Sequence, residues 1–188
     1  MKLVRTELPG VLILEPRRFE DDRGFLYESF NVERFSQHAA EGLPTAFAQD
    51  NHSRSASGVL RGLHYQLRRP QGKLVTCVHG AIFDVAVDVR VGSPTFGQHT
   101  AVTLRGDGPR SFWIPPGFAH GFCVLSATAD VIYKCTDVYV PEDDYGVLWS
   151  DDRIGIRWPI REPTISAKDR QYARLDPARA DLPRFGTG

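Results

Sequence analysis

The chain has 188 residues, with 23 lysines and arginines against 23 aspartates and glutamates, and 41% of its residues are apolar. This composition fits one folded domain and excludes a wholly disordered chain. Zero net charge disfavours general binding to nucleic acids or anionic membranes. No apolar run approaches the ~20 residues that span a bilayer, and charges interrupt the N-terminal stretch where a signal peptide would be apolar. We therefore expect a soluble, cytoplasmic protein with no nucleic-acid or membrane partner.

Short runs rich in β-branched and aromatic residues predict β-strands along most of the chain. In order, they span 11–14, 25–30, 45–49, 59–66, 73–78, 81–89, 100–104, 111–114, 121–125 and 129–140. Clusters of Gly, Pro, Asn and Asp separate them, which is typical of an all-β sandwich or barrel. One internal helix is expected over 31–41, with Asn31 as its N-cap. No linker divides 1–188, so we expect one domain with a peripheral C-terminal tail from about 160 and one short helix near 168–175.

Two smaller patterns give testable expectations about burial. Cys77, Cys123 and Cys135 each lie in an apolar stretch without metal-ligand spacing, which predicts buried free thiols in a reducing compartment. In the strand predicted over 81–89, Asp84 and Asp88 alternate with apolar residues and share one face. We expect Asp88 to be solvated, whereas Asp84 would need a partner if its face lines an interior.

Two segments carry more specific chemistry, residues 58–66 (GVLRGLHYQ) and 113–122 (WIPPGFAHGF). A strand bearing His64 and a Pro-x-Gly-x-x-His turn ending in His120 resemble the two half-motifs of the cupin family of small β-barrels. In metal-binding cupins a second histidine stands two residues after the first and an acid follows, but this chain has Gln66 and Lys73 in those regions. A lysine ammonium would repel a divalent cation, so we expect no metal and disfavour a metal-dependent cupin.

The same residues suit proton transfer without a metal. Histidine takes and returns protons near neutral pH, so His64 is a candidate base. A lysine such as Lys73 can stabilise a developing enolate oxygen, and Tyr133 could deliver a proton from another direction. Arginines and a second histidine would hold an anionic substrate such as a phosphate ester. Together these groups are suited to proton abstraction next to a carbonyl, followed by reprotonation.

At family level, the chain resembles the dTDP-4-dehydrorhamnose 3,5-epimerases. The matching motifs run in order through 50–53, 58–66, 71–75, 83–88, 92–97, 114–122, 133–137 and 166–169. The resemblance implies a dimeric, cupin-type jelly-roll barrel with short peripheral helices that needs neither metal nor cofactor. It also implies inversion of C3 and C5 of dTDP-4-keto-6-deoxy-D-glucose, giving dTDP-4-keto-L-rhamnose for deoxysugar biosynthesis.

The resemblance also implies residue roles. His64 would be the general base and Asp169 its orienting partner, while Tyr133 would be the acid on the opposite sugar face and Lys73 would steady the C4 enolate. The nucleotide part of the substrate would be held, some of it across the dimer, by Phe25, Glu28, Gln49, Asn51 and Lys168. The full set of implied substrate-binding residues is Arg23, Phe25, Glu28, Gln49, Asn51, Arg61, His120, Asp144 and Lys168. Of these, Arg23, Arg61 and His120 would meet the diphosphate and sugar.

Two positions depart from the expected pattern. Asp144 stands where the family usually has a glutamate, and Glu142 or Asp143 could substitute for it. In a regular strand Arg61 and His64 would point to opposite faces, although both are implied to line the pocket, so we expect a β-bulge at the intervening Gly62.

Other interpretations stay open from sequence alone. His120 could close its turn, Tyr133 could be a core aromatic, Arg23 a solvated turn charge and Asp169 an acid at a helix start. The protein could also invert only one centre, C3 or C5, of the sugar. Alternatively, it could be a non-catalytic cupin that binds a nucleotide sugar.

Overall fold

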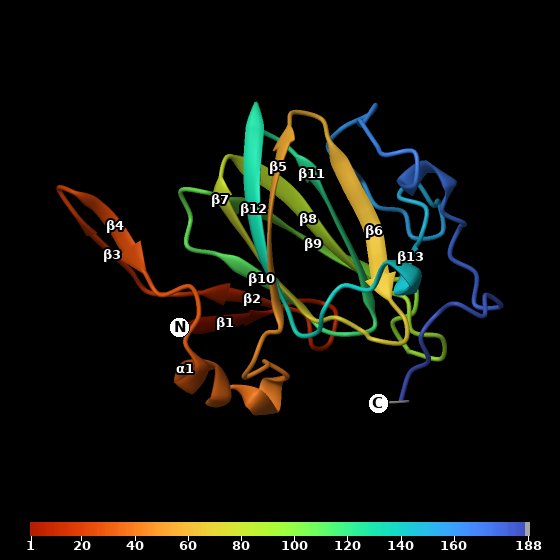
Figure 1. Ribbon diagram of the computed structural model, residues 1–188, viewed down its shortest axis with the longest axis horizontal. Coiled ribbons are helices and arrows are strands. Elements are labelled where there is room, and N and C mark those ends of the chain that lie inside the picture. Colours follow the sequence, from red (N-terminus) through yellow and green to blue (C-terminus); the bar gives the residue numbers. More distant parts are fainter. Residues whose placement is uncertain (187–188) are drawn as a thin grey trace.

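A computed structural model describes residues 1–186, which fold into two facing antiparallel sheets and a protruding hairpin (Figure 1). The six-stranded sheet has the order β1-β2-β10-β7-β12-β5, and the five-stranded sheet has the order β13-β6-β11-β8-β9. The strands are β1 (Lys2–Arg5), β2 (Leu12–Glu15), β3 (Arg18–Asp21), β4 (Gly24–Tyr27), β5 (Gln49–Ala56), β6 (Leu60–Gln66), β7 (Lys73–His79), β8 (Ala81–Asp88), β9 (His99–Arg105), β10 (Ser111–Ile114), β11 (Phe118–Val124), β12 (Thr128–Cys135) and β13 (Asp144–Gly146). The all-β, jelly-roll expectation is confirmed.

The main core lies between the two sheets, where alternate side chains of each strand point inward. Val75 and Phe112 of the six-stranded sheet pack with Ile82 and Phe122 of the five-stranded sheet, and each is almost fully buried. The three cysteines are also buried and free, as the sequence predicts. Tyr133 of β12 is partly buried and packs against the same core.

Helix α1 (Val32–Ser36) begins where the sequence predicts and ends sooner. The Asn31 side chain accepts hydrogen bonds from the backbone N–H groups of Glu33 and Arg34, which confirms it as the N-cap. Phe35 buries the apolar face of the helix against the outer side of the six-stranded sheet, beside Trp113. The chain then makes a separate 3-10 turn, η1 (Ala39–Glu41), instead of one continuous helix.

The C-terminal segment covers the outer side of the five-stranded sheet, opposite the hairpin (Figure 1). Leu175 and Leu182 are buried there against Leu63 and Tyr65 of β6 and Val87 of β8. The short helix expected near this region is a 3-10 turn, η3, that spans Asp169–Gln171. Because the segment packs on one face of β6 and the barrel core on the other, the strand that carries His64 is held from both sides.

Several strand predictions were wrong at their boundaries. Residues 45–49 were predicted as a strand, but β5 begins only at Gln49 and runs through a polar sequence. The strands predicted over 25–30 and 129–140 end early, at Tyr27 and Cys135, and β1, β3 and β13 were not predicted. A second 3-10 turn, η2 (Pro141–Asp143), takes up the chain beyond β12.

Asp88 is fully buried, so the expectation of a solvated residue was wrong. Its carboxylate accepts hydrogen bonds from Arg90, Ser93 and Thr95. Burial alone would raise the pKa of Asp88, but these hydrogen bonds lower it below its ordinary value. Asp84 is also fully buried and has the partner that its position demands, because His120 Nε2 lies 2.5 Å from Asp84 Oδ1.

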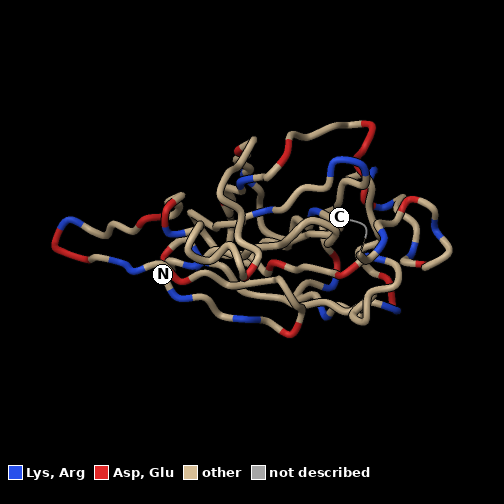
Figure 2. The backbone as a smooth tube through the Cα atoms, turned by 90° about the horizontal axis from the view of Figure 1, so that it is seen from below, with Lys and Arg blue, Asp and Glu red and all other residues tan. Residues whose placement is uncertain are grey.

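Both basic and acidic residues occur along the β3–β4 hairpin and the C-terminal segment (Figure 2). Many of them form ion pairs at the surface, such as Arg23 with Asp21 and Arg174 with Asp152. Within residues 1–186, no helix is both long and apolar enough to cross a membrane.

Candidate active site

A polar cavity of about 230 Å³ opens at the end of the barrel where β5, β6, β7, β12 and β13 come together. It gathers six of the residues singled out from the sequence with four that were not. The lining residues are Gln49, Asn51, His64, Tyr65, Gln66, Gln71, Lys73, Tyr133, Tyr139 and Asp144. The cavity therefore brings together the candidate base, the candidate acid and the candidate enolate-stabilising lysine.

His64 is held by Asp169, although the two residues are 105 positions apart. The His64 Nε2 atom lies 2.9 Å from Asp169 Oδ1, and Asp169 Oδ2 accepts a hydrogen bond from the Gly62 backbone N–H. Asp169 is buried, which alone would raise its pKa, but the hydrogen bonds that it shares with His64, Gly62 and Ser166 lower it. Asp169 is therefore a buried carboxylate in contact with the imidazole. His64 keeps about a third of its side chain exposed.

The pairing of β6 with β11 explains how Arg61 and His64 face the same side. His120 pairs with His64 and Phe122 pairs with Arg61, so three residue steps on β6 match two on β11. This is the β-bulge expected at Gly62, which adopts a φ of 124° that favours glycine. A Cβ on Gly62 would also lie 2.6 Å from the Gly121 Cα, so the bulge requires glycine on steric grounds as well.

Lys73 and Tyr133 come from the opposite wall of the cavity, on the neighbouring strands β7 and β12. Burial lowers the pKa of Lys73, with the Cys135 thiol and the carboxylates of Asp144 and Asp84 acting in the opposite direction. Burial raises the pKa of Tyr133, so its phenol stays protonated at neutral pH. The cavity thus holds a desolvated lysine and a neutral phenol on the wall opposite His64, the candidate base.

Asp144 lies in the cavity and binds two neighbours. Its Oδ2 atom accepts hydrogen bonds from Tyr139 Oη at 2.9 Å and from Lys168 Nζ at 2.6 Å. Asp143 is instead buried outside the cavity, where its carboxylate accepts backbone N–H groups of Arg68 and Arg69. Asp144, rather than its acidic neighbour, therefore occupies the expected position, and it raises the pKa of Lys168 by direct hydrogen bonding.

The remaining predicted residues divide into two groups. Gln49 and Asn51 lie in the cavity and are linked by a hydrogen bond of 2.9 Å. His120 and Arg61 do not line it, although they lie on the same inner face as His64. His120 lies within β11, paired with Asp84, so it does not merely close the preceding turn.

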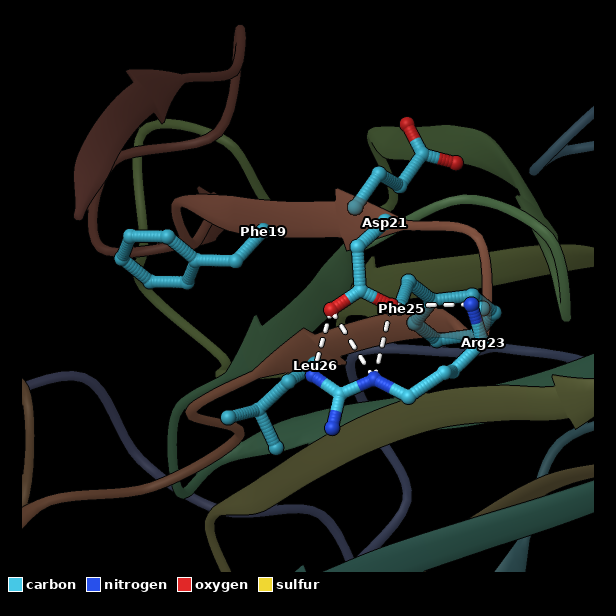
Figure 3. Close-up of a pocket in the computed structure, with 7 residues that line it drawn as sticks. Phe19, Asp21, Arg23, Phe25 and Leu26 are labelled. Carbon is cyan, nitrogen blue, oxygen red and sulfur yellow. Dashed lines mark hydrogen bonds and ion pairs between the residues drawn. The ribbon is translucent and has the colours of Figure 1, made fainter.

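Arg23, Phe25 and Glu28 are not brought to this cavity. Arg23 and Phe25 lie on the β3–β4 hairpin and Glu28 follows it, at the far side of the barrel from β6 and β13 (Figure 1). The Arg23 guanidinium folds back onto the Asp21 carboxylate, beside the rings and side chains at the hairpin tip (Figure 3). Glu28 is paired with Arg34 and Asn31 of the first helix and its cap.

The four lining residues that sequence reasoning did not assign to the site are Tyr65, Gln66, Gln71 and Tyr139. Gln66 stands where a metal-binding cupin would have its second histidine, so its position was a sequence signal for the site. The side-chain amides of Gln66 and Gln71 fix the loop after β12, because both donate to backbone carbonyls of that loop. No sequence signal distinguishes Tyr139, which lies beyond the end of β12. Within the described chain, no three His, Cys, Asp or Glu side chains are grouped so that they could hold a metal ion.

Comparison with known proteins connects this cavity to a family. Residues 5–177 match the protein family described as dTDP-4-dehydrorhamnose 3,5-epimerase. The enzyme of that name from Pseudomonas aeruginosa is 54% identical over 172 residues, covering 91% of this chain and 94% of the relative. The dTDP-4-dehydrorhamnose 3-epimerase of Streptomyces niveus is 38% identical, covering all of this chain and 91% of the relative.

The fold is shared as well as the sequence. A crystal structure of the 3,5-epimerase from Legionella pneumophila, in complex with dTDP-4-keto-L-rhamnose, superimposes with a TM-score of 0.92 at 49% identity and covers 98% of both chains. Because the family match spans most of the sequence and the fold is common to both, the chain belongs to the dTDP-4-dehydrorhamnose 3,5-epimerase family and is an epimerase.

Proposed function

We propose that this chain, as one domain over 1–188, inverts C3 and C5 of dTDP-4-keto-6-deoxy-D-glucose by proton abstraction and reprotonation through an enolate, in dTDP-L-rhamnose or related deoxysugar biosynthesis. The observation that carries the proposal is the cavity in which a carboxylate-held histidine faces a desolvated lysine and a neutral phenol. The buried free thiols suit the cytoplasm, where we infer that the protein works. It requires no metal or cofactor in this mechanism.

The base is His64. Because Asp169 is ionised, the His64 Nε2 that faces it carries the ring proton and donates it. The other ring nitrogen, Nδ1, then has a free lone pair and removes the proton from the carbon next to the substrate's keto group. The positive charge that develops on the imidazole is stabilised by the Asp169 carboxylate.

Lys73 and Tyr133, on the wall opposite His64, act on the enolate oxygen and supply the returning proton. The Lys73 ammonium stabilises the negative charge that develops on the C4 oxygen, and it does so strongly because burial has removed competing water. Tyr133 then donates its phenolic proton to the face of the sugar opposite His64. His64 and Tyr133 come from different sheets, so they approach the sugar from opposite faces, as inversion requires.

Substrate binding uses the polar rim of the cavity and the inner sheet face beside it. Arg61 and His120 face the same interior side as His64 and suit the diphosphate and sugar, while Gln49, Asn51 and Lys168 suit the nucleotide. Asp144 holds Lys168 in place at 2.6 Å. The shorter acid at this position therefore keeps a charged contact at the rim.

We infer that the protein acts as a homodimer in which the hairpin completes the partner's site. Phe19, Phe25 and Leu26 are 52%, 48% and 73% exposed, which leaves an apolar surface uncovered on the hairpin of the single protomer. Arg23, Phe25 and Glu28 cannot serve the cavity of their own protomer from this place. A two-fold dimer would bring each hairpin to the other copy's cavity.

One NMR experiment tests the activity. The candidate substrate is incubated with the protein in D2O, and deuterium is measured at C3 and C5 together with the configuration of the product. We expect deuterium at both carbons and inversion at both. Label and inversion at only one centre would indicate a single-centre epimerase, and label at neither would indicate a protein that only binds the nucleotide sugar.

Replacing Tyr133 by phenylalanine should separate abstraction from inversion. The ring and its packing remain, so His64 should still remove a proton, but the enolate should regain it mostly on the original face. The expected result in D2O is recovered starting sugar that carries deuterium, with little epimeric product at one centre or both. Parental epimerisation by Tyr133→Phe would make Tyr133 a wall residue.

Mixing two inactive variants should restore activity if the hairpin serves the partner. His64→Ala and Arg23→Ala are each expected to be poor enzymes. In a co-expressed mixture, half of the dimers are mixed, and each has one intact site, so about a quarter of the parental activity should return. Turnover of the purified mixture measures this, and a mixture as inactive as its components would contradict a shared site.

A further inference from the structure

A tyrosine that is not part of the cavity lining, Tyr172, packs against the candidate base. The ring centroids of Tyr172 and His64 are 5.7 Å apart with an interplanar angle of 69°, an edge-to-face contact. The proposed chemistry gives this residue no role. We propose that Tyr172 is a positioning residue that fixes the orientation of the His64 imidazole, an inference whose catalytic consequence rests on the proposed function.

The His64–Asp169 hydrogen bond does not fix the ring completely. It restrains one ring atom, Nε2, while about a third of the His64 side chain faces the open cavity. An imidazole held at one atom can still tilt about that point, which would turn Nδ1 away from the substrate carbon. General bases act only within about 10–20° of the productive orientation. The edge-to-face contact with Tyr172 supplies a second restraint, which the His64–Asp169 hydrogen bond alone does not give.

The space for the Tyr172 ring is created by a glycine. Gly146 of β13 pairs with His64 across the sheet, and a Cβ at Gly146 would lie 2.4 Å from Tyr172 Cε2. The Gly146 backbone does not have the positive φ that would demand glycine, so the Tyr172 ring is the obstacle to a side chain there. Gly146, His64 and Tyr172 therefore form one packed unit.

The backbone delivers Tyr172 and Asp169 to His64 from the same turn. Within this turn, the N–H of Gln171 donates to the carbonyl of Lys168 at 3.0 Å. Immediately after Tyr172, the carbonyl of Ala173 accepts a hydrogen bond from the Leu148 N–H, also at 3.0 Å. The tyrosine is thus anchored on both sides, and one short segment sets both contacts of the imidazole.

The ring of Tyr172, rather than its hydroxyl, makes the contact with His64. The hydroxyl is buried near the Asp144–Lys168 ion pair, whose two charges shift its pKa in opposite directions. Burial raises the pKa of Tyr172 to about 12, so it stays a neutral phenol. Tyr172→Phe should consequently preserve positioning, because it keeps the ring that contacts His64.

Two variants displace the ring by independent routes. Tyr172→Ala removes it, and Gly146→Ala pushes it aside while leaving the tyrosine present. Each should lower kcat by about 10- to 100-fold, as a misplaced catalytic group does, with KM within about twofold of the parent. Tyr172→Phe should match the parent. Gly108→Ala is the matched control, because a Cβ there would approach nothing closer than 3.7 Å.

A readout independent of activity is the NMR signal of the His64 Nε2–H proton that binds Asp169. We expect this signal to be sharp in the parent and in Tyr172→Phe, and broadened in Tyr172→Ala and in Gly146→Ala. The double variant Gly146→Ala/Tyr172→Ala should lose no more activity than Tyr172→Ala, because the alanine at 146 then displaces nothing.

The outcomes are distinguishable. Parental kcat together with a sharp imidazole signal in Tyr172→Ala would overturn the positioning role. If Tyr172→Ala does not fold, the same result in Gly146→Ala would overturn it. If the parent protein neither exchanges nor epimerises the nucleotide sugar, the proposed function fails, while the imidazole signal still tests whether Tyr172 orders His64.

Discussion

Replacing His64 by alanine should abolish deuterium uptake at C3 and C5 together, with a loss of about 10²- to 10⁴-fold in exchange rate. The reason is geometric: the described cavity presents one histidine, held through Nε2 by Asp169, so the same Nδ1 serves both carbons. Exchange at each carbon is followed by NMR in D2O. The fold should survive, because His64 is partly exposed and contributes to the cavity rather than to the core.

The control for this variant is His79→Ala. His79 is exposed at the end of β7 and lies outside the cavity, so its replacement should leave exchange at the parental rate. If His64→Ala kept exchange at one carbon, a second base would act there. Exchange surviving at both carbons would remove His64 as the base.

Replacing Lys73 by methionine should lower turnover by about 10²- to 10³-fold, the loss typical of one preorganised oxyanion stabiliser. The variant should unfold at the same temperature or higher. Burial lowers the pKa of Lys73, which means that the folded state disfavours its charge, and methionine keeps the apolar stem without that charge. The Lys73 ammonium would thus destabilise the folded state while accelerating the reaction, a combination that is expected at a catalytic site.

The pH profile of the parent offers a second view of Lys73. The ammonium form is the active one, and its pKa lies below that of a free lysine, so the alkaline fall in kcat/KM should begin below the range of free lysine. Lys73→Met should remove that alkaline limb. The matched control is Lys134→Ala on β12, because Lys134 pairs with Asp50 outside the cavity. Turnover of Lys73→Met within a few-fold of the parent would contradict the enolate role.

Local pattern was enough to predict the strands that bury apolar side chains. The runs over 73–78, 81–89, 100–104 and 111–114 each coincide closely with an observed strand, because their alternation or apolar content states which face is inside. β5 was misplaced for the opposite reason. It is an edge strand whose inner face lines a polar cavity, so Gln49 and Asn51 carry no apolar signal.

The sequence by itself determined the fold class, the family resemblance and the chemical types of the site, because motifs such as 58–66 and 114–122 are contiguous. Tertiary structure decided which of these residues meet. Only the fold joins His64 to Asp169 across 105 positions, and only the β6–β11 bulge turns Arg61 to the same side as His64. The fold also places the hairpin residues, such as Arg23, away from the cavity. The physical reason is that sequence periodicity records which face a side chain occupies, whereas distances between strands depend on how the sheets close on one another.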